Sequence, residues 1–181
     1  MKPLTGLGLA ATLSLGLALG ASVSDLRAAD FPRSPAPQNV PSRFAFEEEV
    51  TLLPSVQVGE TPLGRRTRIP ITGGTFSGPG FSGRVLSGGA DWQLLRKDGS
   101  VAIDADYMIE TDDQVQIHVR NRGLLFTNPA TGQRYRWTTP VFEAPMGKYD
   151  GLNQAAFVSL ITPSGDKDHP AVRITVYRIG D

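Results

Sequence analysis

The sequence predicts an all-β protein, a single domain folded as a closed antiparallel β-barrel of about nine strands. Short runs of alternating apolar and polar residues recur from Phe44 to the end of the chain, a pattern typical of strands with one buried face. Turn-forming residues separate these runs, since the chain holds 20 Gly and 14 Pro. Beyond the N-terminal segment, no stretch shows apolar residues at helical spacing. Closure into a barrel would leave no strand edge unpaired.

Size and charge exclude several function classes. The 181 residues suffice for one domain, and 18 Lys plus Arg balance 18 Asp plus Glu. A chain of zero net charge lacks the basic surface that nucleic-acid binding requires. The absence of cysteine excludes disulfides, thiolate catalysis and cysteine metal sites. We therefore predict no nucleic-acid partner, no metal and no cofactor, and the sequence does not specify an oligomeric state.

The first 43 residues resemble an export address followed by a linker. Residues 1–29 combine Lys2, a long apolar run and small residues, which predicts a signal peptide and a periplasmic or secreted protein. The alternative is that the run remains as a membrane anchor; after cleavage no membrane insertion is expected. Residues 30–43 hold four prolines among polar residues, which predicts an extended tether. The barrel domain then spans residues 44–181.

The first strands are expected on both sides of a glycine pair. Residues 44–52 predict a strand, with the acidic run Glu47–Glu49 on a solvated face. Residues 69–76 predict a strand that breaks at Gly73–Gly74. A second glycine pair, Gly88–Gly89, is followed directly by Asp91 and Trp92.

The later strands follow from alternation and turns. Asp98-Gly99 is a strong hairpin signal. The strand 101–110 should place Asp104 and Asp106 on the face opposite Tyr107. Further strands are predicted at 115–119 with a continuation at 124–126, at 135–142, 155–161 and 172–176, with one helical turn at 148–153.

Two apparent catalytic motifs lack their structural context. Gly78–Gly83 spells GxGxxG, but a strand rather than a helix is predicted after it, and Pro79 removes an amide donor. Ser164–Lys167 spells SxxK, but Pro163 and Pro170 bracket it too closely for the required helix. We reject both.

Asp91 is the strongest candidate for chemistry. Apolar surroundings raise a carboxyl pKa, and that is how general acids and bases are made. A proton-transfer site would use Asp91 as the base, with Tyr107 or Arg136 as the electrophilic partner. The alternative is that Asp91 is a turn cap bonded to backbone amides.

A ligand-binding barrel would need walls and orienting groups. The aromatic candidates for the walls are Trp92, Tyr107, Trp137 and Tyr149. The polar candidates for orientation are Arg136, His118 and Asn153. His118 shares a strand face with Gln116 and Arg120, which would line the interior if turned inward and form surface if turned outward.

Several ordered motifs resemble the DUF3237 family, also called UPF0311. They are Arg66-x-x-Ile69-Pro70-Ile71-Thr72-Gly73-Gly74-Thr75-Phe76-x-Gly78-Pro79, Gly83-x-Val85-Leu86-x-Gly88-Gly89-Ala90-Asp91-Trp92, Asp104-Ala105-x-Tyr107, Thr111-Asp112-Asp113 and Tyr149-x-x-Leu152-Asn153. The resemblance covers residues 46–179. It implies a single β-barrel of lipocalin-like shape and no general assigned activity.

Three functions remain open from sequence. The first is an exported barrel that binds a small, partly apolar molecule in its interior. The second is a cofactor-free isomerase or lyase with Asp91 as general base. The third is a structural barrel without a ligand, which a fully packed interior would favour.

Overall fold

The computed structural model describes residues 39–180, which form ten strands and one short 3-10 helix. The predicted signal peptide and most of the predicted tether lie outside these residues. The first strand begins at Ser42, so the last two residues assigned to the tether belong to the barrel. No helix within residues 39–180 is long and apolar enough to cross a membrane.

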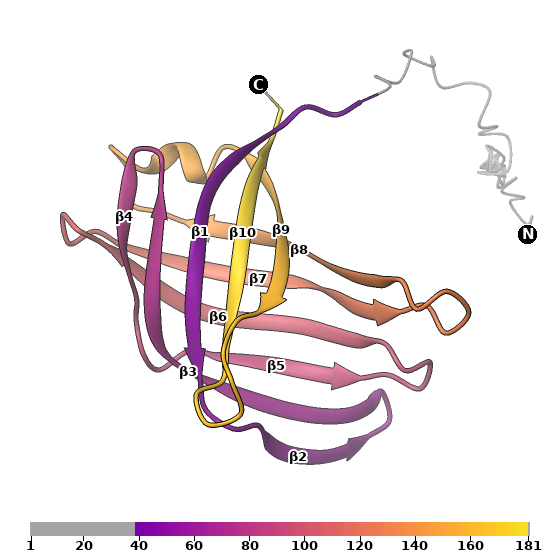
Figure 1. The fold of residues 1–181 in the computed structure, drawn as a ribbon. Helices are drawn as coiled ribbons and strands as arrows, with labels where there is room; N and C mark the ends of the chain where they lie inside the picture. The colour runs from indigo at the N-terminus through magenta and orange to yellow at the C-terminus, as the bar shows by residue number, and fades with distance from the viewer. Residues whose placement is uncertain (1–38, 181) are drawn as a thin grey trace, which may run out of the picture. The chain divides into compact units, whose positions relative to one another are not determined.

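Apart from the strand over residues 56–61, which was not predicted, the strands follow the predicted order along the chain (Figure 1). Their bounds are β1 Ser42–Leu52, β2 Val56–Thr61, β3 Gly64–Gly78, β4 Phe81–Val85, β5 Ala90–Leu95, β6 Val101–Thr111, β7 Gln116–Thr127, β8 Arg134–Glu143, β9 Ala156–Pro163 and β10 Ala171–Ile179. The 3-10 helix Asp150–Leu152 forms where the helical turn was predicted. Gly99, at φ +81°, occupies the predicted Asp-Gly hairpin turn between β5 and β6.

The sheet closes on itself, which confirms the predicted antiparallel barrel. Neighbouring strands run β1-β10-β9-β8-β7-β6-β4-β3, and pairing between β1 and β3 completes the ring. Strands β4 and β5 share one position in the ring, each between β3 and β6. Strand β2 pairs only with β3 and extends the sheet outside the ring.

The predicted break in the strand over residues 69–76 is wrong. Strand β3 does not break at Gly73–Gly74 but runs on to Gly78. Both glycines have φ +143°, a conformation that L-residues avoid. A side chain on Gly74 would also overlap the backbone carbonyl of Glu49 on β1. The glycine pair therefore bends β3 against β1 and lets it change partner from β5 to β4.

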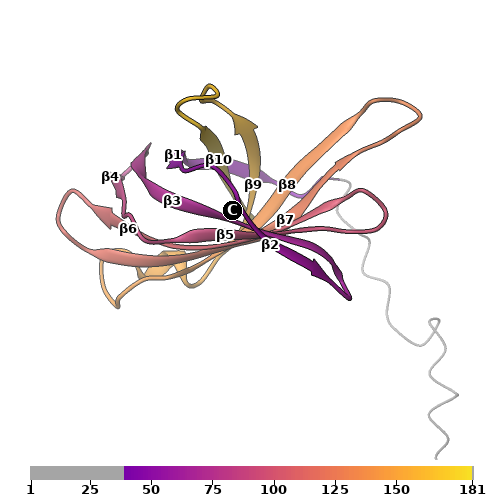
Figure 2. The ribbon, with the colours of Figure 1, turned by 90° about the horizontal axis from the view of Figure 1, so that it is seen from below.

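The barrel has one weak seam, between β8 and β9. These strands pair only through Trp137 with Leu160 and Thr138 with Ser159. Figure 2 shows the β7–β8 hairpin diverging from the β9–β10 hairpin on one side.

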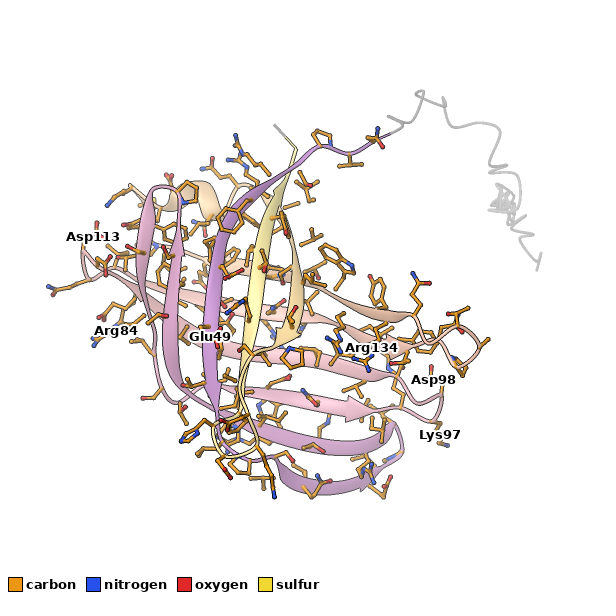
Figure 3. All side chains as sticks on the ribbon, viewed as in Figure 1. Glu49, Arg84, Lys97, Asp98, Asp113 and Arg134 are labelled. Atoms are coloured by element: carbon orange, nitrogen blue, oxygen red, sulfur yellow. The ribbon has the colours of Figure 1, made fainter. Side chains whose placement is uncertain are left out.

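Inward-facing side chains divide the interior into two regions. Phe46 packs edge-on against Phe76, Phe81 and Phe142, with ring centroids 5.0–6.0 Å apart. Phe142 in turn contacts Phe157 at 5.0 Å. We call this cluster the aromatic end. The opposite region, which we call the cavity end, encloses a hollow. Charged side chains such as Asp113 and Lys97 project from the periphery (Figure 3).

Candidate functional site

A cavity of about 230 Å³ lies inside the cavity end of the barrel. Its volume falls just below the range of roughly 300–1,000 Å³ for pockets that hold drug-sized ligands, so it suits a smaller molecule. The walls are mainly aliphatic, from Val50, Leu52, Ile69, Ile71, Ile103, Ala105, Leu125, Ile161, Pro163, Val172 and Ile174. Five polar side chains interrupt this lining, namely Asp91, Gln93, Tyr107, Asn121 and Arg136.

Asp91 reaches the cavity because β5 begins directly after Gly88–Gly89. Alternation along β5 turns Asp91 and Gln93 inward, and the neighbours of Asp91 across the sheet are Ile69 and Ala105. The carboxylate accepts hydrogen bonds from Gln93 Nε2 at 2.7 Å and from the Asp104 amide at 3.1 Å. Burial raises the pKa of Asp91 and outweighs the opposing effect of these hydrogen bonds.

The outward Asp104 provides a contrast on the next strand. Its carboxylate lies 3.1 Å from Nε of both Arg120 and Arg122. Desolvation acts to raise the pKa of Asp104, but the hydrogen bonds from the two guanidinium groups outweigh it and the pKa is lowered. Within residues 39–180 Asp91 forms no ion pair of this kind, so the inward carboxyl is the one that holds its proton more strongly.

Tyr107 and Glu48 form a buried pair beside the cavity. The Tyr107 hydroxyl donates a hydrogen bond to Glu48 Oε2 at 2.6 Å, and both side chains are almost fully buried. Burial raises the pKa of Glu48 to about 7 despite this hydrogen bond. Burial, together with the negative charge of Glu48, also raises the pKa of Tyr107 well above its usual value.

The burial of Glu48 corrects the prediction that Glu47–Glu49 forms a solvated face. Alternation along β1 turns Glu48 inward with Phe46 and Val50. Its two neighbours face outward, where Arg173 lies within 3.5 Å of both carboxylates. The run of three acids hid this alternation, although the apolar residues on each side of Glu48 carried the signal.

A second buried polar group lies on β7. Asn121 Nδ2 lies 3.4 Å from Ser159 Oγ, and Ser159 Oγ lies 2.6 Å from Thr138 Oγ1. All three side chains are buried. Among the described residues, neither Asn121 Oδ1 nor Glu48 Oε1 has a hydrogen-bond partner. Sequence reasoning did not select Asn121, Glu48 or Gln93, because an isolated polar residue inside a strand does not reveal which face it occupies.

The structure brings together the three residues predicted for chemistry. Asp91 comes from β5, Tyr107 from β6 and Arg136 from β8, and all three line the cavity. Arg136 reaches it beside the weak β8–β9 seam.

Two predicted wall residues, Trp92 and Trp137, lie outside the cavity. Alternation turns Trp92 outward, where it is 42% exposed and Arg68 lies 5.8 Å above its ring. Trp137 is 38% exposed, and its ring centroid lies 6.3 Å from that of Tyr177. Their inward neighbours are Asp91 and Arg136, so the prediction that these tryptophans form the walls is corrected.

His118 likewise lies on the outer face of β7. Its Nε2 is 2.8 Å from Asp106 Oδ1 and its Nδ1 is 3.8 Å from Glu143 Oε2. The face that His118 shares with Gln116 and Arg120 is therefore turned outward and forms surface, which was one of the two alternatives left open by the sequence. Among residues 39–180, no cluster of three or more His, Asp or Glu side chains is placed to hold a metal ion.

Tyr149 and Asn153 lie at the aromatic end. Tyr149 contacts Phe81 at 5.8 Å and donates a hydrogen bond to Asp113 Oδ1 at 2.7 Å. The Asn153 amide exchanges hydrogen bonds with the Ala144 backbone at 2.8 and 2.9 Å. Neither residue lines the cavity, which corrects their predicted role there, and both fix the loop between β8 and β9.

Comparison with known sequences identifies relatives over this whole domain. The model of DUF3237, "Protein of unknown function", matches residues 41–179. A UPF0311 protein of Rhodopseudomonas palustris strain TIE-1 is 30% identical over 70% of this chain and 90% of its own length. A protein of Penicillium herquei named as a hydroalkoxylation enzyme is 28% identical over 68% of this chain and 83% of its own length.

Solved structures show the same barrel. A β-barrel-like protein from Acinetobacter baumannii AYE, at 30% identity, covers 81% of this chain and 99% of its own with a TM-score of 0.71. An enzyme from Penicillium herquei, at 21% identity, covers the same shares with a TM-score of 0.64 and shares the fold. On the sequence match over residues 41–179, the chain belongs to the DUF3237 (UPF0311) family.

Proposed function

We propose that this protein is a cofactor-free acid–base catalyst that transfers a proton on a small, largely apolar molecule held in the cavity. The observation that carries the proposal is Asp91, a carboxyl with a raised pKa in an aliphatic cavity. Tyr107 and Arg136 line the same space. A buried carboxyl whose pKa is raised can donate its proton as a general acid and recover it as a base.

The reaction class we favour is the addition of a hydroxyl group to a carbon–carbon double bond. In this step the O–H bond breaks, a C–O bond forms, and the other alkene carbon gains a proton. No electrons are gained or lost overall, so the chain's own acids and bases suffice. Asp91 would protonate the carbon, and Arg136 would stabilise negative charge that develops on the hydroxyl oxygen as its proton leaves.

The Penicillium relative supports this class without defining the substrate. That protein is named as a hydroalkoxylation enzyme, and hydroalkoxylation is this addition of an alcohol to an alkene. The reaction requires an acid and a base but no cofactor. When both groups belong to one molecule the product is an isomer, and the reverse reaction is a lyase step. The sequence-based alternative of an isomerase or lyase falls within the same class.

A binding protein without turnover is the second candidate. The aliphatic lining of the cavity favours it, because such walls hold an apolar ligand whether or not a reaction follows. The two candidates differ in what Asp91→Asn would do. A binding protein does not convert its ligand, so this change has no turnover to remove. In a catalyst, the change removes the proton donor and turnover is lost.

The test is the cyclisation of 2-allylphenol, which carries a hydroxyl group and a double bond in one small molecule. The full chain, Asp91→Asn and Asp106→Asn would be compared by chromatography of the products. Asp106 is a matched control because it lies on the outer face of β6, opposite Ala90. We expect turnover by the wild type and the control, and a loss of about 100-fold or more in Asp91→Asn.

Two results would overturn the proposal. Equal turnover by Asp91→Asn and the wild type would remove Asp91 from the mechanism. The same experiment would be repeated with a panel of related unsaturated alcohols. If the three proteins bind these compounds and 2-allylphenol but convert none of them, the binding protein is favoured.

A further inference from the structure

We propose that Tyr107 and Glu48 form a proton relay that accepts the proton of a ligand hydroxyl group, so that the ligand enters the cavity with its hydroxyl end innermost. This inference rests on the proposed function, since it assigns the base that acts opposite Asp91. It also identifies the ligand class as small unsaturated alcohols or phenols.

The first support is the direction of the Tyr107 hydrogen bond. The phenol donates its one proton to Glu48 Oε2 at 2.6 Å. An oxygen that has donated its proton still accepts through its lone pairs. Because Tyr107 lines the cavity and Glu48 does not, a ligand in the cavity meets Tyr107, with Glu48 behind it. Glu48 is thus a positioning residue that acts through Tyr107.

The second support is a surplus of acceptors at this depth. Glu48 Oε1 and Asn121 Oδ1 are buried and have no partner among the described residues. Buried polar atoms in folded proteins are almost always hydrogen-bonded. Asn121 Oδ1 is an acceptor that lines the cavity, and Glu48 Oε1 is an acceptor when the carboxyl is ionised, as at pH 8. The group that completes this site is therefore a hydrogen-bond donor, such as a hydroxyl, rather than a carboxylate or ketone.

The surrounding charges are few. The neighbours of Glu48 across the sheet are Ile174 on β10 and Phe76 on β3, which do not titrate. The titratable groups that face the pair from the cavity are Asp91 on β5 and Arg136 on β8. Burial raises the pKa of Glu48 to about 7, so the carboxyl can take up and release a proton near neutral pH.

The proposed step balances in atoms and charge. The ligand O–H proton passes to the Tyr107 oxygen as the Tyr107 proton passes to Glu48 Oε2. The ligand oxygen then bonds to one alkene carbon while the other carbon takes the proton of Asp91. Glu48 ends protonated and Asp91 ionised, and exchange of one proton with water through the cavity restores both.

The test compares phenol with anisole, in which a methyl group replaces the hydroxyl proton. Affinities for the full chain would be measured by NMR titration at pH 6 and pH 8. We expect the wild type to bind phenol about tenfold more tightly than anisole at pH 8, because anisole leaves the buried acceptors unpaired. The preference should be smaller at pH 6, where Glu48 is protonated and competes as a donor.

Three variants locate the effect. Tyr107→Phe should abolish the preference for phenol, and Glu48→Gln should remove its dependence on pH. Glu49→Gln is the matched control, because this carboxylate is adjacent in sequence but lies outside the barrel beside Arg173. It should behave as the wild type. If Tyr107→Phe fails to fold, Glu48→Gln alone decides the question through the pH dependence.

Equal affinities for phenol and anisole in the wild type would overturn the relay. So would a preference that persists unchanged in Tyr107→Phe, or a pH dependence that persists in Glu48→Gln. These failures differ from a failure of the proposed function. Turnover that depends on Asp91 without a phenol preference removes only the relay, whereas a phenol preference without turnover leaves a donor-binding site and removes the catalyst.

Discussion

The aromatic end and the cavity end of the barrel interior are built from the same strands, but the first is filled and the second is hollow. Strand β1 supplies Phe46 to the aromatic end, Glu48 to the middle, and Val50 and Leu52 to the cavity. At the aromatic end rings fill the space edge to face. At the cavity end the interior is incompletely filled and carries a carboxyl with a raised pKa.

This difference indicates where stability and chemistry reside. Dense aromatic packing contributes free energy of folding but leaves no room for a ligand. A cavity with buried acids is costly for folding and useful for proton transfer. The barrel tolerates the cavity and its buried acids because the aromatic packing lies on the same strands. Four predictions test this division, from the largest expected effect to the smallest.

Truncation at the aromatic end should cost the most stability. Phe46→Ala should lower the free energy of unfolding by about 3–5 kcal/mol, because it opens a void in a filled region. Ile161→Ala, at the partly buried wall of the existing cavity, should cost clearly less. Urea denaturation of both variants measures the difference, and equal losses would mean that the two ends are equally packed.

Glu48 should make stability depend on pH. Its pKa is about 7 when folded against 4.5 as the ordinary value, so between these values the folded chain holds a proton that the unfolded chain releases. The contribution of Glu48 to stability is therefore fully present below pH 4.5 and falls by up to about 3 kcal/mol as pH rises through 7. Thermal melts across this range should lose that component in Glu48→Gln and keep it in Glu49→Gln.

Asp91→Asn should separate stability from activity. Burial disfavours the ionised form of Asp91, and an asparagine removes that charge while keeping an oxygen that can accept from Gln93. We expect a melting temperature at pH 8 at or above that of the wild type, together with loss of turnover. A large drop in melting temperature would show instead that the carboxylate mainly supports the fold.

The outer aromatic residues should have the smallest effect on binding. Trp92 and Trp137 face away from the cavity, so Trp92→Phe and Trp137→Phe should leave phenol affinity within error of the wild type. NMR titration under the same conditions as for Tyr107→Phe provides the comparison. A marked loss in either tryptophan variant would place the binding surface outside the barrel.

Much of the fold was predictable because strand alternation and turn chemistry are local. Alternation over residues 101–110 correctly placed Asp104 and Asp106 on the face opposite Tyr107, and in the structure Tyr107 is on the buried face. The closure of the ring was predicted from the need to pair every edge. The uninterrupted course of β3 was not, because a glycine pair marks either a break or a bend, and only contact with Glu49 on β1 distinguishes them.

The site was only partly predictable, for a related reason. Asp91, Tyr107 and Arg136 were selected on residue chemistry, and pairing of distant strands brings them together. Trp92 and Trp137 were wrongly predicted to line the cavity. Aromatic character alone does not show whether a side chain points into the barrel, and both strands carry apolar and polar residues on each face. Glu48 was missed because its outward neighbours are also acidic. Which of the three acids is buried depends on how β1 pairs with β3 and β10, and β10 is far away in the sequence.

The most direct test of the account is a crystal structure of the protein with phenol bound. We expect the ring between the aliphatic walls of the cavity end and its oxygen within hydrogen-bond distance of Tyr107 or Asn121. Phenol bound only on the outer face beside Trp137, with none in the cavity at saturating concentration, would contradict the claim that the cavity end is the functional site.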